Sequence, residues 1–145
     1  MLLINNKKNQ QNHNQADNKR SKIIVFFFLL IYPANTFADG HLTEDQKNKV
    51  TECAGIYYAN SMIPQAELEL DKIVHSFAAK KFLSSYLVKE GVNEDNLNKE
   101  LIKVVDARYG KPYEESTTSE CDSYIFELIP NSKNEIDKLI KSGIY

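Results

Sequence analysis

Two groups of residues in this chain have types and spacing that could carry chemistry. The first is the tripeptide Asp39-Gly40-His41, which would bind copper(II) or nickel(II) if it formed a free amino terminus. The terminal amine, two deprotonated backbone amides and the His41 imidazole would then supply four nitrogens in one plane, a geometry that suits both metals. A histidine in third position also occurs by chance. The metal site therefore depends on cleavage directly before Asp39.

The second group is the pair Cys53 and Cys121, the two cysteines of the chain. An exported protein meets oxidising conditions, so we expect one structural disulfide between them. Closing a loop of this length restricts the unfolded chain and stabilises the fold by about 4 kcal/mol on the chain-entropy model. The wide separation, the lack of a CxxC pair and the lack of a local basic cluster argue against a redox switch or a nucleophilic cysteine.

Residues 19–39 have the three parts of an export signal. Ten apolar residues, Ile23 to Tyr32, follow the basic residues Lys19, Arg20 and Lys22. Ten apolar residues are too few to cross a bilayer, which takes roughly 20. Pro33 then breaks the helix, and Thr36 and Ala38 place small side chains at the third and first positions before a cut. We therefore expect signal cleavage between Ala38 and Asp39, and a periplasmic or secreted product.

This interpretation divides the chain into three parts. Residues 1–22 are rich in Asn, Gln and Lys and should be a disordered polar leader. Residues 23–38 hold the hydrophobic region and the cleavage site, and residues 39–145 form a single mature helical domain. The alternative is a functional polar tail on a protein that Ile23–Tyr32 anchors in the membrane. Cleavage leaves no stable membrane anchor.

The charge of the mature part restricts its partners. Residues 1–38 carry five of the 18 basic residues and one of the 20 acidic ones, which leaves 13 against 19 and a formal charge of −6. Nucleic acids and anionic lipids both favour clustered Lys and Arg, so neither is an expected partner. Another envelope or extracellular protein, basic in character, or a cationic ligand fits this charge better.

Helix start and stop residues after Thr43 predict an all-α fold, a small bundle of about five helices with one long central helix. Capping-box patterns at Thr43–Gln46 and Ser132–Glu135 predict the starts of the first and last helices. A third helix begins at the cap Asn93 and stops at Gly110. Tyr113–Thr118 is the one candidate for a sizeable loop. Cys121 then lies on the apolar face of the fourth helix, as Cys53 does on the first.

The longest predicted helix, Gln65–Glu90, follows Pro64 and has two apolar stripes on nearly opposite sides. One stripe holds Ala66, Leu70, Ile73, Val74 and Phe77, and the other holds Leu68, Ala79, Phe82, Leu83 and Tyr86. We interpret this helix as the centre of the bundle, with neighbours on both sides. The functional alternative leaves the second stripe exposed as a groove for another protein.

Candidate catalytic residues are scarce. The sequence has no Gly-rich phosphate loop, no HExxH, no GxSxG and no calcium loop. The acidic residues Glu44, Asp45, Glu94 and Asp95 lie in first helical turns, where they favour the helix dipole. His75 lies on the second stripe of the long helix and is interpreted as a packed core residue. An unrecognised hydrolase or redox enzyme is therefore the least favoured reading, and no cofactor other than copper or nickel is expected.

Aromatic side chains supply the candidates for a binding surface, because tyrosine is common at protein interfaces. We single out Tyr58, Phe82, Tyr86, Tyr109 and Tyr113. In layout alone, the short, exported, acidic, helical chain resembles small periplasmic immunity proteins and acid-stress chaperones, which implies a binding role. The leading hypothesis is a non-enzymatic protein-binding module of inhibitor, immunity or adaptor type.

Overall fold

The computed structural model describes residues 41–143. The described residues belong to one compact unit. They form five helices: α1 (Glu44–Ser61), α2 (Leu70–Lys89), α3 (Glu94–Arg108), α4 (Glu115–Leu128) and α5 (Ser132–Ser142). Residues 41–143 contain no strand, so the all-α prediction is confirmed. The expected leader (1–22) and signal region (23–38) lie outside the described residues.

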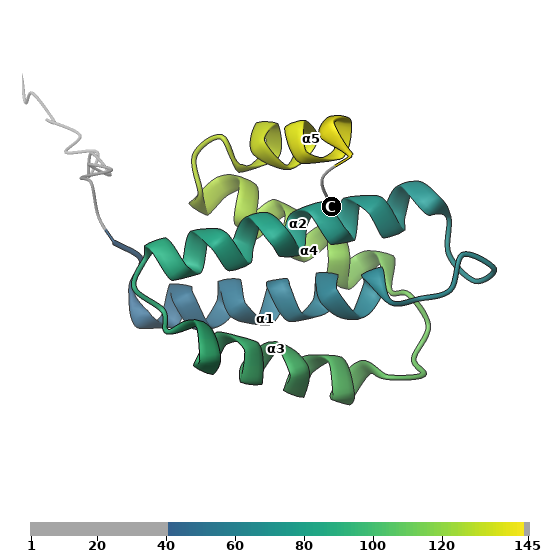
Figure 1. Cartoon of the computed structure of the whole chain (residues 1–145), viewed down its shortest axis with the longest axis horizontal. Coiled ribbons are helices and arrows are strands. Elements are labelled where there is room, and N and C mark those ends of the chain that lie inside the picture. Colours follow the sequence, from purple (N-terminus) through teal and green to yellow (C-terminus); the bar gives the residue numbers. More distant parts are fainter. Residues whose placement is uncertain (1–40, 144–145) are drawn as a thin grey trace, which may run out of the picture. The chain divides into compact units, whose positions relative to one another are not determined.

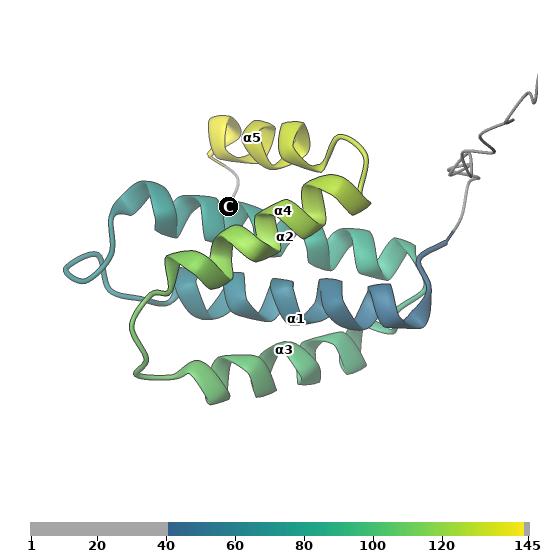
Figure 2. The same ribbon diagram turned by 180° about the vertical axis from the view of Figure 1, so that it is seen from behind.

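Three helices, α2, α3 and α4, pack directly on α1. Helices α3, α1 and α2 lie side by side, α4 crosses diagonally over α1, and α5 packs on α2 and α4 (Figures 1 and 2). The long helix that the sequence predicts is α2, the longest of the five in residues 41–143, and it packs on both α1 and α5. Helix α1 contacts α2, α3 and α4, and its small residues Ala54 and Gly55 are buried. The core cluster and the side chains packed on it lie within residues 42–140.

Close contact between α1 and α3 depends on Gly55. A Cβ atom at this position would lie 2.6 Å from the Cβ of Val104 on α3. That separation is well inside van der Waals contact, so any larger side chain would push the two helices apart. The glycine therefore sets the distance at which α3 lies against α1.

Two of the predicted helix starts, those of α2 and α5, differ from the structure. Helix α2 begins at Leu70, because the chain first makes a turn in which Leu68 N–H donates to Pro64 O at 3.2 Å and the Leu68 side chain becomes buried. Helix α5 has Asn131 at its cap, in the left-handed region at φ 61°, without a side-chain cap bond. Its predicted capping box is absent because the Ser132 hydroxyl donates to the Ile125 carbonyl at 3.2 Å.

The predicted loop at Tyr113–Thr118 is shorter than expected, because α4 already begins at Glu115. The Thr118 hydroxyl donates to the Glu114 carbonyl and accepts a hydrogen bond from the Asn60 amide on α1, at 3.1 Å each. A hydroxyl-rich segment favours a loop only when its hydroxyls lack such partners. The other predicted starts are correct: Thr43 and Gln46 form the capping box of α1, and Asn93 caps α3.

The two apolar stripes of α2 have different surroundings. In the second stripe Leu68, Ala79 and Leu83 are buried, against neighbours that include α1 and α5. In the first stripe Leu70 is 56% exposed and Phe77 is 40% exposed. Ile73 of the first stripe is buried, so the expectation that neighbours cover both stripes is wrong only for an outer row of the first stripe, Leu70 and Phe77.

One side of α1 is tied to α4 by covalent and polar contacts, which together we call the seam. Cys53 and Cys121 form the predicted disulfide, with their Cα atoms 5.5 Å apart. One turn further along α1, the Tyr57 hydroxyl donates to Asp122 Oδ1 at 2.5 Å. The Asn60–Thr118 hydrogen bond continues the same row. These contacts fix α4 across the middle and the carboxyl-terminal half of α1.

Candidate functional site

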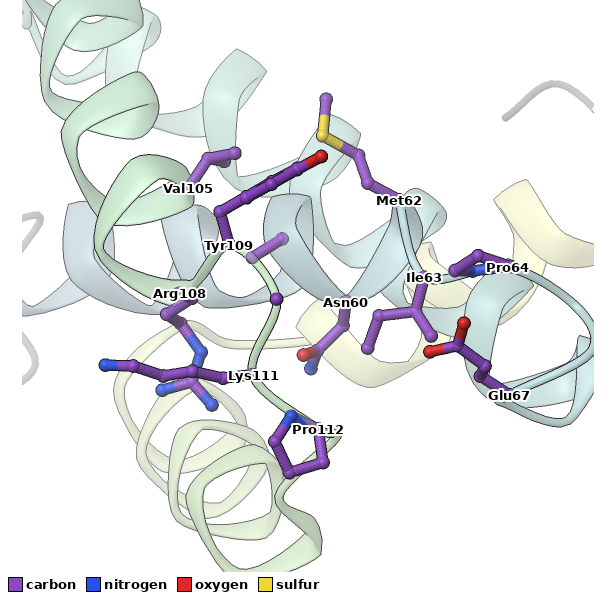
Figure 3. A pocket seen from close by; sticks show the side chains of 12 residues that line it. Asn60, Met62, Ile63, Pro64, Glu67, Val105, Arg108, Tyr109, Lys111 and Pro112 are labelled. Carbon is purple, nitrogen blue, oxygen red and sulfur yellow. The ribbon is translucent and has the colours of Figure 1, made fainter.

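A cleft of about 500 Å³ opens where the carboxyl-terminal ends of α1 and α3 meet. One wall is the end of α1 and the turn after it, and the other is the end of α3 and the segment leading to α4 (Figure 3). The side chains that define it and carry the argument below are Met62, Ile63, Glu67, Arg108, Tyr109 and Lys111. This cleft is the candidate functional site.

Two chain reversals shape the cleft. Helix α1 ends at Ser61 and the chain turns at Pro64, where no helical hydrogen bond can be donated. Helix α3 ends at Arg108, and Gly110 has φ 72°, a left-handed conformation that glycine adopts without strain. The Lys111 N–H donates to the Arg108 carbonyl at 3.0 Å and closes this second turn. Both turns direct their side chains to the same space.

Apolar side chains at the cleft are exposed. Tyr109 is 89% exposed and Met62 is 54% exposed, and Figure 3 shows them facing each other beside Val105. Ile102, one turn earlier on the same flank of α3, is 52% exposed and lies outside the cleft. Exposed apolar groups that gather around a hollow, with an aromatic ring among them, are typical of sites that bind another molecule.

Charged groups sit at both ends of the cleft. Figure 3 shows the head groups of Arg108 and Lys111 together on one side, and the Glu67 carboxylate on the other. Arg108 Nη2 donates to Glu114 Oε2 at 3.1 Å. The hydrogen bond from the Thr117 hydroxyl, followed by the Arg108 contact, holds the pKa of the Glu114 carboxyl below its usual value. Within residues 41–143, neither Lys111 nor Glu67 forms an ion pair within 4.0 Å.

A second polar cluster joins α1, α2 and α4 next to the disulfide. Asp122 Oδ1 accepts the Tyr57 hydroxyl and lies 3.1 Å from His75 Nε2. The hydrogen bond to Asp122 raises the pKa of His75 against the opposing effect of burial, and Asp137 on α5 adds to the rise. Burial and the Asp122 contact raise the pKa of Tyr57. None of the three lines the cleft, and the arrangement holds three helices together.

The five aromatic candidates do not form one surface. Phe82 and Tyr86 stack with ring centroids 6.1 Å apart and pack on the core. Tyr58 and Tyr113 are half-buried under lysine ammonium groups, Lys80 at 4.9 Å and Lys72 at 5.0 Å from the ring centroids. Tyr109 alone among the five is exposed and lines the cleft. Sequence patterns gave no indication of its partners Met62 and Ile63, because a pattern does not show where two helix ends meet.

The expected metal chelate falls mostly outside the described residues, since Ala38, Asp39 and Gly40 are not described. The His41 side chain is 83% exposed, and its Nδ1 lies 3.4 Å from Glu90 Oε2. The same carboxylate oxygen accepts the Leu42 N–H at 2.9 Å. Within residues 41–143, no group of three or more His, Cys, Asp or Glu side chains could hold a metal ion. Both cysteines of the chain form the disulfide and are not available as metal ligands.

Comparisons with protein-family models, with curated proteins and with solved structures find no match to this chain. None of the five helices in residues 41–143 combines the length and the apolar character that crossing a bilayer requires. The fold of residues 41–143 is a small all-helical bundle, linked by one disulfide and with an open cleft at one end of α1.

Proposed function

We propose that this protein is an exported, non-enzymatic binding module of inhibitor, immunity or adaptor type, which holds a segment of another envelope or extracellular protein in the cleft. The observation that carries the proposal is the exposure of Tyr109 opposite Met62 across a hollow of about 500 Å³. A tyrosine ring offers a large contact area at a low cost in conformational entropy, and tyrosine and arginine dominate the energetics of protein interfaces.

The chemistry of the cleft favours binding over catalysis. Its lining residues include one carboxylate, Glu67, and two cations, and none of them is a serine, threonine, cysteine or histidine. A nucleophile with an adjacent base, or a paired acid and base, is the usual requirement for hydrolysis. The His75–Asp122 pair could exchange protons, but it lies outside the cleft and is engaged in holding helices together.

Export is the second part of the proposal. It is supported by the apolar decapeptide Ile23–Tyr32 and by the disulfide, a bond that persists in oxidising compartments. Amino-terminal sequencing of the protein recovered from the envelope or the medium should give Asp39 as the first residue. A product that retains residues 1–38 would contradict export by cleavage.

The binding role is tested with residues 39–145, which contain the whole core. Immobilised wild-type protein should recover a partner from the envelope fraction of the source cell. The variant Tyr109→Ala should lose at least about tenfold in affinity for it, since truncation of an interface anchor costs about 1.4 kcal/mol or more. The control Ile102→Ala removes an apolar side chain that is 52% exposed and lies outside the cleft, and it should bind within about twofold of wild type. Equal recovery by Tyr109→Ala and wild type would contradict the proposal.

A further inference from the structure

The cleft has a direction, because its two ends carry opposite charge. Arg108 and Lys111 lie together at one end, Glu67 lies at the other, and Asn60 and Ile63 lie between them (Figure 3). Ile63 thus lies between a positive end and a negative one, and the pair Met62 and Tyr109 lies beside it. A ligand that made only apolar contacts would not use the charge at either end.

The positive end keeps an uncompensated charge. Glu114 pairs with Arg108, and Lys111 acts on the same carboxylate, so two cations share one anion. A second hollow, of about 650 Å³, begins at these two cations and contains the carboxylates of Glu52 and Glu100. Those carboxylates already pair with Lys49 at 2.8 Å and Lys103 at 2.6 Å. The excess positive charge at Lys111 is therefore available to a ligand from either hollow.

The negative end is similarly available. Glu67 lies in the turn between α1 and α2, where its N–H donates to the Pro64 carbonyl at 2.8 Å. The backbone is thereby fixed, whereas the carboxylate faces the cleft region without an ion pair among residues 41–143. An unpaired carboxylate is common in an acidic domain and does not by itself indicate a binding site. Its position across the apolar patch from Lys111 gives the cleft its polarity.

We propose that the cleft binds a short peptide segment of a partner protein in one orientation, with an apolar or aromatic side chain between Met62 and Tyr109. An acidic side chain of that segment pairs with Lys111 beside Arg108, and a basic side chain pairs with Glu67. This inference rests on the proposed binding function and names the chemistry of the partner. Complementary charges at the rim of an interface fix register and reject wrong partners more than they add affinity.

The shape of the cleft favours a short segment over a long helix. A helix seated in a groove needs a row of apolar contacts at positions i, i+3, i+4 and i+7. Here the apolar side chains are few, and charged groups lie on both sides of Ile63, so one anchor residue with a charged residue on each side matches the cleft. The segment therefore has a basic, apolar, acidic order in one direction along the chain.

Selection from a random peptide library on residues 39–145 tests this orientation. Wild-type protein should enrich peptides with one fixed order of basic, apolar and acidic residues. The double variant Glu67→Lys/Lys111→Glu exchanges the two charges and should enrich the reverse order. The single variant Lys111→Glu should weaken a wild-type peptide by about fivefold, as expected for exposed charges. The control Lys99→Glu/Glu120→Lys makes the same charge changes at exposed positions outside the cleft and should leave the order unchanged.

The outcomes separate this inference from the proposed function. Peptides that lose affinity on Tyr109→Ala but show the same charge order on wild type and on the exchanged variant would overturn the inference and leave the binding cleft intact. Peptides that ignore Tyr109→Ala, or no enrichment at all, would count against the cleft as a binding site. Reversal of the order by the Lys99 and Glu120 control would overturn the inference, because charges outside the cleft would then select the peptides.

Discussion

The seam and the cleft lie along the same helix, α1, but they differ in whether their polar and apolar side chains are buried and paired. In the seam, Tyr57 and Asn60 are buried, and each donates a hydrogen bond to a side chain of α4. In the cleft, Met62 and Tyr109 are exposed, and Lys111 and Glu67 have no ion pair among the described residues. Satisfied buried groups stabilise a fold, whereas exposed apolar groups and unpaired charges are available to a partner. We infer from this difference that the seam stabilises the fold and that the cleft binds a partner.

Removal of the disulfide should have the largest effect on stability. The double variant Cys53→Ala/Cys121→Ala leaves no free thiol, and its free energy of unfolding should fall by about 4 kcal/mol, because the unfolded chain regains the freedom of a long loop. Urea denaturation followed by circular dichroism measures the change. A loss under about 1 kcal/mol would remove the main support for the seam as the stabilising region.

A smaller effect is expected at the contact that places α3, which carries one wall of the cleft. Gly55→Ala should lower the free energy of unfolding by about 2 kcal/mol, since the new methyl group overlaps Val104. The double variant Gly55→Ala/Val104→Ala should recover part of this loss, because the shorter side chain relieves the overlap. Thermal and urea unfolding of the three proteins provide the test. A Gly55→Ala protein as stable as wild type would show that α3 is free to shift.

The polar cluster of Tyr57, His75 and Asp122 beside the disulfide should also respond to pH, through His75. Because Asp122 raises the pKa of His75 in the folded state, its contribution to stability is fully present below about pH 6.5, the ordinary histidine value, and is lost as pH rises through the folded pKa. The free energy of unfolding of wild type minus that of His75→Gln should therefore be larger at pH 5.5 than at pH 8.5. When both proteins also carry Asp122→Asn, the pH dependence of the difference between their free energies of unfolding should be smaller. If the free energy of unfolding of wild type minus that of His75→Gln increased with pH, the stabilising His75–Asp122 contact would be contradicted.

The smallest stability effect is expected in the cleft. Tyr109→Ala removes a side chain that is 89% exposed, so the free energy of unfolding should change by no more than about 0.5 kcal/mol. The same variant is the one expected to lose the partner. A loss of 2 kcal/mol or more in urea denaturation would mean that Tyr109 is part of the packed structure, and the contrast with the seam would fail.

Local patterns were sufficient to predict most of the helices and the disulfide. The Thr43–Gln46 box, the Asn93 cap and the Cys121 stripe depend on neighbouring residues alone, and all three are confirmed. The predicted start at Gln65 and the predicted box at Ser132 fail because Leu68 and Ser132 make tertiary contacts that no local pattern contains. Tyr109 was predicted as a contact residue. Its cleft depends on the approach of two helix ends, which the spacing within one helix does not specify.

The central claim, that recognition belongs to the cleft and stability to the seam, is tested most directly by a nuclear magnetic resonance titration. A selected peptide is added to ¹⁵N-labelled residues 39–145, and the backbone amide shifts are followed. The account predicts the largest shifts in residues 62–67 and 105–111, with little change around Cys53, Asp122 and the outer row of α2. Shifts centred on Leu70 and Phe77, with the cleft unchanged, would contradict it.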